Sequence, residues 1–457
     1  MMIKRNILWS LSLIGGTFLS AQNKPNVLVI LLDDAGYSSF GFNGAKDIQS
    51  PCIDDLAKEG VVCTDAHVMG SVSAPSRASL ITGRYGQRFG FECNLDAPDA
   101  GVPHDEETLG DVFQASGYRT AALGKWHLGN LPSMHPNAQG FDYFYGFIAG
   151  SRSYFYRPLA DDASTSLQKI EENGKASPFT GYLTDVLTDR AIQYIDQDKS
   201  RPFMMYLAYN AIHTPLEATE ADLARFAGHK RQKIAAMTYA VDRAVGRLVD
   251  YLKRESLFEN TLIFFLTDNG GAINNLSSNL PYKGFKGNKF EGGHRVPFFV
   301  VWGDRLKMAP RSFDGLTSSL DIMATSVAAA GISKDRLLKP IDGVDLMPYL
   351  THSKKGNPHE ILFWRKMGAS AIRTPLYKRI EVEGLGKVLY DMRKDPYETC
   401  NLIFKKSKVD RTLVKQYKEW EKQMIPRKWD DGGEWPQVTD TIHFDLMNNR
   451  APRKLFP

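Results

Sequence analysis

Two continuous apolar runs stand out from the pattern of hydrophobic and polar positions along the chain. They cover residues 26–32 and 261–267 and contain many β-branched or aromatic side chains. Runs of this kind predict strands buried on both faces, as in a parallel sheet covered by helices. Further strands are predicted at 118–123 and 203–208, and apolar residues at helical spacing from Met237 to Leu252 predict a helix with one buried face. This alternation predicts an α/β fold.

The pattern changes near residue 350. Residues 351–358 are polar and include Lys, Gly, Asn and Pro, which is typical of a linker. Beyond them, alternating residues at 378–382 predict a small antiparallel sheet, and a helix is predicted around 409–423. With 457 residues, 43% of them apolar, the chain is long enough for one large core and a smaller one. We expect a catalytic domain over 22–350 and a C-terminal α+β subdomain over 351–457.

The first 21 residues have the pattern of a signal peptide. Two basic residues precede an apolar run from Ile7 to Phe18, and Leu19-Ser20-Ala21 is a small-residue cleavage site. The run is too short to span a bilayer comfortably, and Gln22, rather than Cys, argues against a lipid anchor. We expect an exported protein, periplasmic or secreted, without a stable membrane anchor. The net charge of +5 falls by two when this segment is removed, which is too weak a bias to indicate nucleic acid as a partner.

Acidic residues follow both apolar runs at the point where each strand ends. Asp33 and Asp34 come directly after 26–32, and Asp268 and Asn269 follow 261–267. Ligands of open α/β sheets bind at the carboxyl edge of the strands, and buried carboxylates are costly unless a cation joins them. Three carboxylates and an amide oxygen form an all-oxygen set that suits Ca²⁺ or Mg²⁺.

Residues 73–84 read Ser-Ala-Pro-Ser-Arg-Ala-Ser-Leu-Ile-Thr-Gly-Arg. Pro75 can open a helix because its backbone suits the first turn, and Gly83 is typical of a helix end. Ser73 would then lie just before the helix, beside free N–H groups and one turn from Arg77. That setting stabilises an oxyanion or a nucleophile. Taken alone, such a segment more often indicates an ordinary capped helix.

The pattern Ser-x-Pro-Ser-Arg-x-x-Leu-x-x-Gly-Arg over 73–84 resembles the signature of the formylglycine-dependent sulfatases. The resemblance extends to three other segments: Gly-Lys-Trp-His-Leu-Gly at 124–129, the Lys-Gly-x-x-x-Glu-Gly-Gly-x-Arg-x-Pro run at 286–297, and the Leu-Tyr-Asp to Asn-Leu stretch at 389–402. It implies an alkaline-phosphatase-like α/β sandwich, with a large mixed, mostly parallel sheet flanked by helices. A smaller C-terminal domain with an antiparallel sheet and a helix would follow.

The resemblance also implies the nucleophile and the metal site. Ser73 would be oxidised to 3-oxoalanine (formylglycine), whose hydrate attacks sulfur. A Ser at this position indicates the radical type of maturating enzyme rather than the Cys-specific one. The metal, Ca²⁺ with Mg²⁺ as the alternative, would be held by the following residues: Asp33, Asp34, Ser73, Asp268 and Asn269.

The remaining catalytic roles are implied in the same way. Arg77 would favour the alkoxide of residue 73, and His127 would contact its hydroxyl and remove a proton. His213 would be the general acid. Lys125 and Lys286 would hold the sulfate. The residues alone do not separate Lys286 from two nearby competitors, Lys283 and Lys289.

The expected substrate is a sulfated glycan, attacked by an exo-acting carbohydrate O-sulfatase. The loop at 274–282 weakly resembles enzymes for galactose or N-acetylgalactosamine sulfates. Aromatic residues at 150–156 would either stack on a sugar or pack as an ordinary surface loop. One alternative is a phosphatase or phosphodiesterase of the same superfamily. The other is a metal-bearing glycan-binding protein, if Ser73 stays unoxidised; His127 and His213 argue against it, because binding alone needs no acid–base groups.

Overall fold

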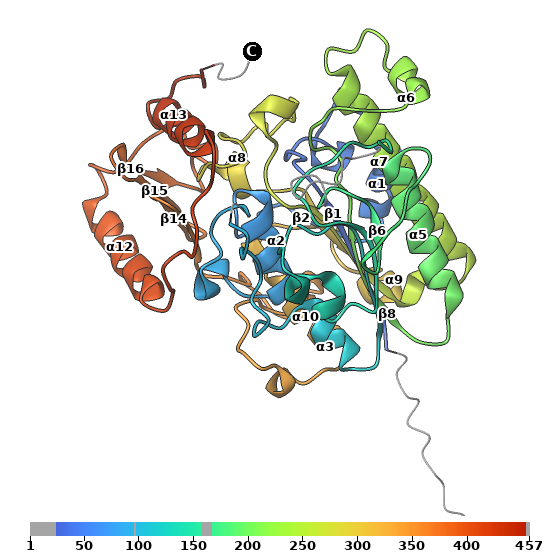
Figure 1. The fold of residues 1–457 in the computed structure, drawn as a ribbon. Helices are drawn as coiled ribbons and strands as arrows, with labels where there is room; N and C mark the ends of the chain where they lie inside the picture. The colour runs from blue at the N-terminus through green and yellow to red at the C-terminus, as the bar shows by residue number, and fades with distance from the viewer. Residues whose placement is uncertain (1–23, 96, 158–166, 454–457) are drawn as a thin grey trace, which may run out of the picture.

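A large mixed sheet forms the centre of the computed structural model, which describes residues 24–95, 97–157 and 167–453 (Figure 1). Its strand order is β11-β2-β10-β9-β1-β8-β4-β5-β6-β7. The predicted signal peptide lies outside the described residues. The strands have these bounds: β1 Asn26–Leu32, β2 Val61–Cys63, β4 Arg119–Lys125, β5 Tyr143–Phe147, β6 Glu171–Glu172, β7 Lys175–Ala176, β8 Phe203–Ala208, β9 Thr261–Thr267, β10 Phe298–Val301 and β11 Ser312–Phe313. A separate two-stranded sheet pairs β3 Ala66–His67 with β12 Thr317–Ser318.

The four predicted strands lie side by side and run parallel. β1 pairs with β8 and with β9, and β4 pairs with β8 and with β5, all in parallel register. β10 runs antiparallel to β9, so the sheet is mixed and mostly parallel, as expected. In this register Leu32 lies opposite Thr267, and Gly124 lies opposite Ala208. The segments that follow β1, β4, β8 and β9 therefore begin at the same edge of the sheet.

Helices cover both faces of this sheet, which explains why its strands are apolar throughout (Figure 1). Along β1, Leu28, Ile30 and Leu32 contribute to one buried cluster, and Val27 and Val29 contribute to the other. The first cluster includes residues of α1 Pro51–Lys58, α5 Leu183–Gln197 and α7 Gln232–Arg254. The second includes residues of α2 Ser73–Thr82, α3 Leu109–Gln114 and α10 Asp321–Ala329. The shorter helices are α6 Glu220–Arg225, α8 Glu291–His294, α9 Gly303–Leu306 and α11 Met347–Leu350.

Two helices predicted from the sequence are present, but the predicted start of one of them, α2, was wrong. α7 contains the predicted stripe, and the apolar residues of that stripe are buried. α2 begins at Ser73, two residues before Pro75, and ends at Thr82, where Gly83, with a φ of 65°, caps it. Ser73 is thus the first helical residue instead of the residue before the helix. Proline is compatible with any position in the first turn, because N–H groups there have no partner within the helix.

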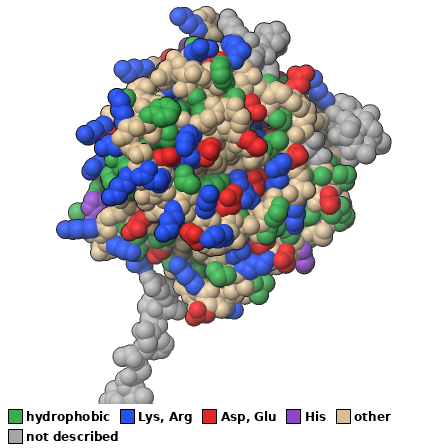
Figure 2. All heavy atoms as spheres, turned by 90° about the vertical axis from the view of Figure 1, so that its left-hand side faces the viewer, with side chains coloured by type: hydrophobic (Ala, Val, Ile, Leu, Met, Phe, Trp, Pro, Cys, Tyr) green, Lys and Arg blue, Asp and Glu red, His purple; other side chains and the backbone are tan. Residues whose placement is uncertain are grey.

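The C-terminal layer, residues 362–447, carries the predicted antiparallel sheet and helix. Its sheet order is β13-β14-β15-β16. The elements are β13 Leu362–Lys366, β14 Ala369–Arg373, β15 Tyr377–Val382, β16 Gly386–Asp391, α12 Ser407–Glu421 and α13 Trp435–Met447. Figure 2 shows this side of the molecule with Lys and Arg side chains spread over it and Asp and Glu among them. Within the described ranges, the structure contains no helix that is long and apolar enough to cross a membrane.

A buried polar cluster joins this layer to the main sheet. The Lys378 ammonium lies 2.9 Å from carboxylate oxygens of both Glu291 and Glu398. His67 and His294 complete a group with Glu291 whose ligand atoms lie within 4.8 Å of one another. Lys378 also contacts His294, and Arg295 lies 3.1 Å from Glu291, so basic side chains already supply positive charge to this cluster. The cluster holds α8 in place, directly after the segment that carries Lys286.

Candidate active site

Four oxygen-bearing side chains meet at the carboxyl edge of the large sheet. Asp33 and Asp34 follow β1, Asp268 and Asn269 follow β9, and all four are at most 2% exposed. The hydroxyl of Ser73 lies 3.3 Å from Asp33 Oδ1 and 3.2 Å from Asn269 Oδ1. The backbone N–H of Asp34 donates to Asp268 Oδ1 at 3.3 Å. The parallel register of β1 and β9 thus brings residues more than 230 positions apart into one oxygen cluster.

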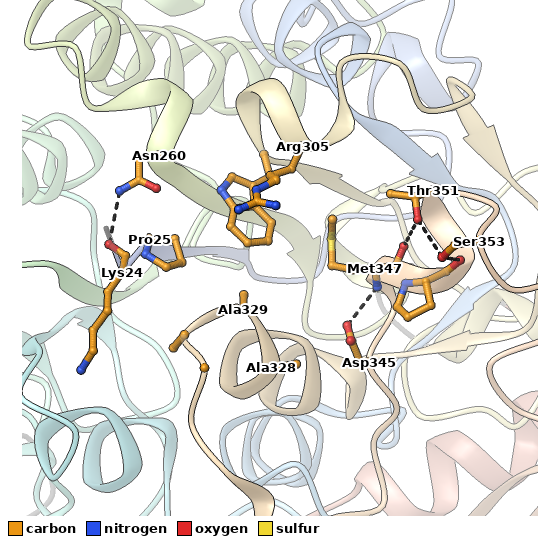
Figure 3. A pocket seen from close by; sticks show the side chains of 14 residues that line it. Lys24, Pro25, Asn260, Arg305, Ala328, Ala329, Asp345, Met347, Thr351 and Ser353 are labelled. Atoms are coloured by element: carbon orange, nitrogen blue, oxygen red, sulfur yellow. Dashed lines mark hydrogen bonds between the residues drawn. The ribbon is translucent and has the colours of Figure 1, made fainter. Parts of the chain in front are cut away.

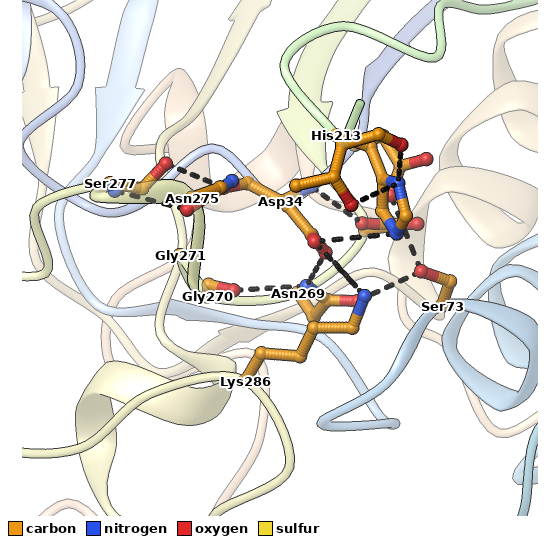
Figure 4. A network of polar contacts seen from close by, with 12 residues as sticks. Asp34, Ser73, His213, Asn269, Gly270, Gly271, Asn275, Ser277 and Lys286 are labelled. Atoms are coloured by element: carbon orange, nitrogen blue, oxygen red, sulfur yellow. Dashed lines mark hydrogen bonds and ion pairs between the residues drawn. The ribbon is translucent and has the colours of Figure 1, made fainter. Parts of the chain in front are cut away.

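Each carboxylate of the cluster has a cationic partner. Lys125 Nζ lies 2.7 Å from Asp33, and Arg77 lies 2.8 Å from Asp268. Lys286 Nζ lies 2.8 Å from Asp34 Oδ1. Figure 4 shows the Lys286 ammonium and the His213 ring both directed at the Asp34 carboxylate. The pairing offsets the desolvation of the buried acids.

The same charges decide the protonation of the acids. Burial alone would raise the pKa of the Asp33 carboxyl, but the positive charges of Lys125, His213 and Arg77 outweigh it and lower that pKa. Burial likewise opposes ionisation of Asp34, and Lys286 is the main charge that lowers its pKa. Both groups are therefore ionised at neutral pH, as ligands of a cation must be.

The donor set fits a hard cation. The Nδ2 amide of Asn269 donates to Asp34 Oδ1 at 2.7 Å and to Gly270 O at 2.9 Å, which leaves its Oδ1 atom facing Ser73. Three carboxylates, this amide oxygen and the residue 73 oxygen form the oxygen-only environment that Ca²⁺ and Mg²⁺ prefer. Ligand atoms of Asp33, Asp34 and His213 also lie within 4.8 Å of one another. The three acids and the amide suit a hard cation better than the imidazole does.

Ser73 occupies the first position of α2, where backbone N–H groups lack partners within the helix. The N–H of Ala74 donates to Asn94 Oδ1 at 3.2 Å, which ties the start of the helix to a neighbouring loop. Arg77, one turn on, is fully buried and also donates to the carbonyl of Lys125 at 3.2 Å. The nucleophile position therefore lies beside a helix N-terminus and a fixed guanidinium, a setting that stabilises negative charge on its oxygen.

His127 lies two residues after Lys125, in a left-handed backbone conformation with φ 56°. Its backbone N–H donates to the carbonyl of Ile148 at 3.0 Å. Among the described residues, no hydrogen-bond partner is found for the buried ring nitrogen Nδ1. Burial of the ring, together with the charges of Lys125 and Arg77, lowers the pKa of His127 well below its ordinary value. The imidazole is therefore neutral at pH 7 and can accept a proton.

His213 is oriented by the backbone that follows it. Its Nδ1 donates to the carbonyl of Thr214 at 2.6 Å, because a carbonyl oxygen only accepts. Its Nε2 lies 3.6 Å from Asp34 Oδ2. The hydroxyl of Tyr154 donates to the carbonyls of Asn210 and His213 at 2.6 and 2.9 Å. His213 thus presents Nε2, the nitrogen that can exchange a proton, toward the oxygen cluster.

A cavity of about 400 Å³ opens onto these groups. It is lined by six of the predicted residues: Asp34, Ser73, Lys125, His127, His213 and Lys286. The other four predicted residues, Asp33, Arg77, Asp268 and Asn269, are buried around the same oxygen cluster.

Position in the structure separates the three candidate lysines. Lys286 lines the cavity and contacts Asp34. The ammonium of Lys283 donates to Asn449 Oδ1 at 2.7 Å, and that of Lys289 donates to Ser71 Oγ at 3.0 Å. Of the three, only Lys286 lines this cavity.

Sequence reasoning missed one wall of the cavity. This wall comes mainly from the C-terminal layer: Lys366, Asp431, Gly432, Trp435 and Thr439. Asn94 lines the cavity as well. No local motif marks these residues, because they approach Ser73 only through tertiary packing. Of the two readings of segment 150–156, packing holds for Tyr154, which is fully buried and stacks on Tyr182.

A larger cavity, of about 670 Å³, lies at the opposite edge of the sheet (Figure 3). Lys24, Pro25 and Asn260 line it and directly precede β1 and β9, so it faces the amino ends of those strands. Two alanines of α10, Ala328 and Ala329, form part of its wall. None of the candidate catalytic residues lines this larger cavity. The smaller cavity at the carboxyl edge of the sheet is therefore the candidate active site.

Comparison with known proteins identifies the family. The sulfatase family model matches residues 25–332, more than half of the chain. "Uncharacterized sulfatase YdeN" of Escherichia coli (strain K12) is 34% identical over 404 residues, covering 76% of this chain and 70% of that protein. "N-acetylgalactosamine-6-sulfatase" of Mus musculus is 30% identical over 403 residues, covering 82% and 75%.

The solved structures agree with this result. The crystal structure of Ps i-CgsB superposes with a TM-score of 0.83 at 35% identity and covers 93% of this chain and 99% of that one. The same protein has been solved in complex with k-i-k-neocarrahexaose. The expected alkaline-phosphatase-like fold is thereby confirmed. The chain belongs to the sulfatase family and is a sulfuric ester hydrolase.

Proposed function

We propose that this enzyme removes sulfate esters from sulfated glycans, using a formylglycine made from Ser73. The observation that carries the proposal is the cavity in which Ser73, two lysines and two imidazoles converge beside buried carboxylates. Two similar proteins support the substrate class: one is named for N-acetylgalactosamine 6-sulfate, and the other is solved with a neocarrahexaose. Asn274, from the loop at 274–282, lines the cavity and supports our preference for galactose or N-acetylgalactosamine sulfates, attacked in exo fashion.

Two groups that the family uses complete this site. Oxidised to formylglycine, residue 73 would supply a hydrated aldehyde, with one hydroxyl to serve as the nucleophile and a second that would let sulfate leave. Ca²⁺, or Mg²⁺ as the alternative, supplies positive charge for the sulfate oxygens and would be held by Asp33, Asp34, Asp268, Asn269 and residue 73.

The chain's own residues position the ester and move the protons. Lys125 and Lys286 have their ammonium groups on the cavity wall and bind sulfate oxygens, which fixes the sulfur in line with residue 73. Arg77, held against Asp268, stabilises negative charge at residue 73. His213 donates a proton from Nε2 to the departing sugar oxygen, and neutral His127 accepts the proton released from residue 73. Overall, the sulfate ester and one water become the sugar alcohol, sulfate and one proton.

The maturation and location of the enzyme are part of the same proposal. A serine at position 73 calls for a radical maturating enzyme of the Ser type, acting before the chain folds around a residue that is 1% exposed in the structure. The basic and apolar pattern of residues 1–21 supports export to the periplasm or the medium.

Mass spectrometry of the peptide that carries residue 73 tests the proposal directly. Protein made anaerobically with a Ser-type maturating enzyme should show a loss of two hydrogens and react as an aldehyde. That protein should then release sulfate from sulfated galactans or glycosaminoglycans, measured by ion chromatography, whereas Ser73→Ala should not. An intact serine, or release of phosphate from an aryl phosphate in place of sulfate, would contradict the proposal.

A further inference from the structure

A second cavity adjoins the active-site cavity on the side of the C-terminal layer. It measures about 350 Å³ and lies against β13 to β15 and the start of α13. Gly287, Lys366 and Thr439 line both cavities, so the two are neighbours with a common wall. Each is within the size range of small-ligand sites, roughly 300–1,000 Å³.

The wall that the two cavities share is tightly packed. Gly287 has a φ of 91°, and a Cβ placed there would lie 2.9 Å from Thr439 Oγ1. A side chain at position 287 would therefore be strained and would collide where the cavities meet. The N–H of Lys289 donates to His443 Nε2 at 3.0 Å, which anchors α13 to the segment that carries Lys286. The sulfate-binding lysine and the junction of the cavities are thus part of one packed unit.

The lining suits a ligand rich in hydroxyl groups. Trp435, in the first turn of α13, lines the active-site cavity and is 41% exposed. Its flat ring offers an apolar surface, which suits the face of a sugar. In the second cavity, Glu383 and Asp440 bring carboxylates, and Arg427 is paired with Asp430. Lys366 lines both cavities and is paired with Asp431. A lipid or a flat aromatic ligand would call for a mainly apolar lining.

We propose that the two cavities form one groove for a sulfated oligosaccharide. The sugar that carries the scissile sulfate lies against Trp435, and its neighbour in the chain lies past Thr439 in the second cavity. The hydroxyl groups of that neighbour meet the charged and polar side chains that line this cavity. This inference rests on the proposed function, and it makes the natural substrate at least a disaccharide.

The measurement is the ratio of kcat/KM for a sulfated disaccharide or tetrasaccharide to kcat/KM for the matching sulfated monosaccharide. The wild-type ratio is expected to be about tenfold or more, equivalent to one well-placed additional contact. Asp440→Trp fills the second cavity from an exposed position of α13 and should bring the ratio close to one. Gln437→Trp is the matched control, because Gln437 is exposed on the same helix and lines neither cavity. It should keep the wild-type ratio.

Two further measurements make the result decisive. Arg427→Gln is a milder change in the second cavity and should lower the ratio about threefold, the weakening expected for a lost exposed charge contact. Calorimetric binding of both saccharides to Ser73→Ala reports the groove without turnover, and the oligosaccharide should bind more tightly. Equal binding of the two saccharides, or a ratio unchanged by Asp440→Trp, would overturn the groove. If the oligosaccharide binds tightly but the matured enzyme releases no sulfate, the proposed function is refuted. The proposal that the two cavities form one binding groove would not be affected by that result.

Discussion

Replacing Lys286 by alanine tests how the site recognises sulfate. The ammonium lies on the cavity wall, 2.8 Å from Asp34, and its side chain is 11% exposed. Lys283, three residues earlier, provides the control, because its ammonium points to Asn449 and lies outside this cavity. The two substitutions remove the same charge from the same segment. They differ in whether that charge can reach the substrate.

The expected loss follows from one charge-assisted contact in a largely buried setting. Such a bond contributes about 1.5–3 kcal/mol, and each 1.4 kcal/mol corresponds to a factor of ten in rate. Lys286→Ala should therefore lower kcat/KM by about 10- to 150-fold. Lys283→Ala should change kcat/KM less than about threefold and instead lower the free energy of unfolding by roughly 1 kcal/mol, because it loses hydrogen bonds to the C-terminal layer.

The assay is initial-rate sulfate release by both variants, with residue 73 shown to be formylglycine in each. Urea unfolding of the same samples separates activity from stability. Lys286→Arg should recover part of the activity, because it restores the charge with a different shape. The reasoning would be refuted if Lys286→Ala kept kcat/KM within threefold of the wild type, or if Lys283→Ala lost as much activity as Lys286→Ala.

Three other predictions concern the catalytic loop, pH and the buried cluster. Gly150→Ala places a Cβ 2.7 Å from His127 Nε2, so the rate of sulfate release should fall about tenfold or more; a rate equal to that of the wild type would contradict this. Burial raises the pKa of Asp242 from 3.8 to about 6. Between about pH 4 and 6 the folded protein therefore binds a proton that the unfolded chain has lost, and the free energy of unfolding falls as the pH rises through this range. Asp242→Asn should therefore be roughly 1–2 kcal/mol more stable than wild type at pH 8 and similar at pH 4 in urea unfolding; the opposite trend would exclude this cause. Lys378→Met leaves the buried Glu398 without its ion-pair partner, whereas Glu291 keeps Arg295 at 3.1 Å; the substitution should cost about 3 kcal/mol of unfolding free energy, and a change below 1 kcal/mol would contradict it.

Much of the main sheet could be predicted because its signal is local. A strand buried on both faces must be apolar at every position, so β1 and β9 are visible as uninterrupted runs. The acidic residues that end those runs are equally visible, and parallel pairing then requires them to share an edge. The resemblance of 73–84 to the sulfatase signature added the nucleophile position. The first residue of α2 was misplaced because Pro75 is compatible with several positions of a first helical turn.

The sequence by itself determined the strands, the acids at their ends and the family pattern, because each depends on neighbours along the chain. The residues alone left Lys283, Lys286 and Lys289 as alternatives, and the family resemblance favoured Lys286. The structure adds that, of the three, Lys286 lines the cavity while the other two contact Asn449 and Ser71. It also decided that Tyr154 supports the backbone at His213 and that Trp435 forms part of the active-site wall. Those contacts depend on how the C-terminal layer and the loops pack against the sheet. Packing of that kind is the sum of many small contacts between distant segments, and no local pattern records it.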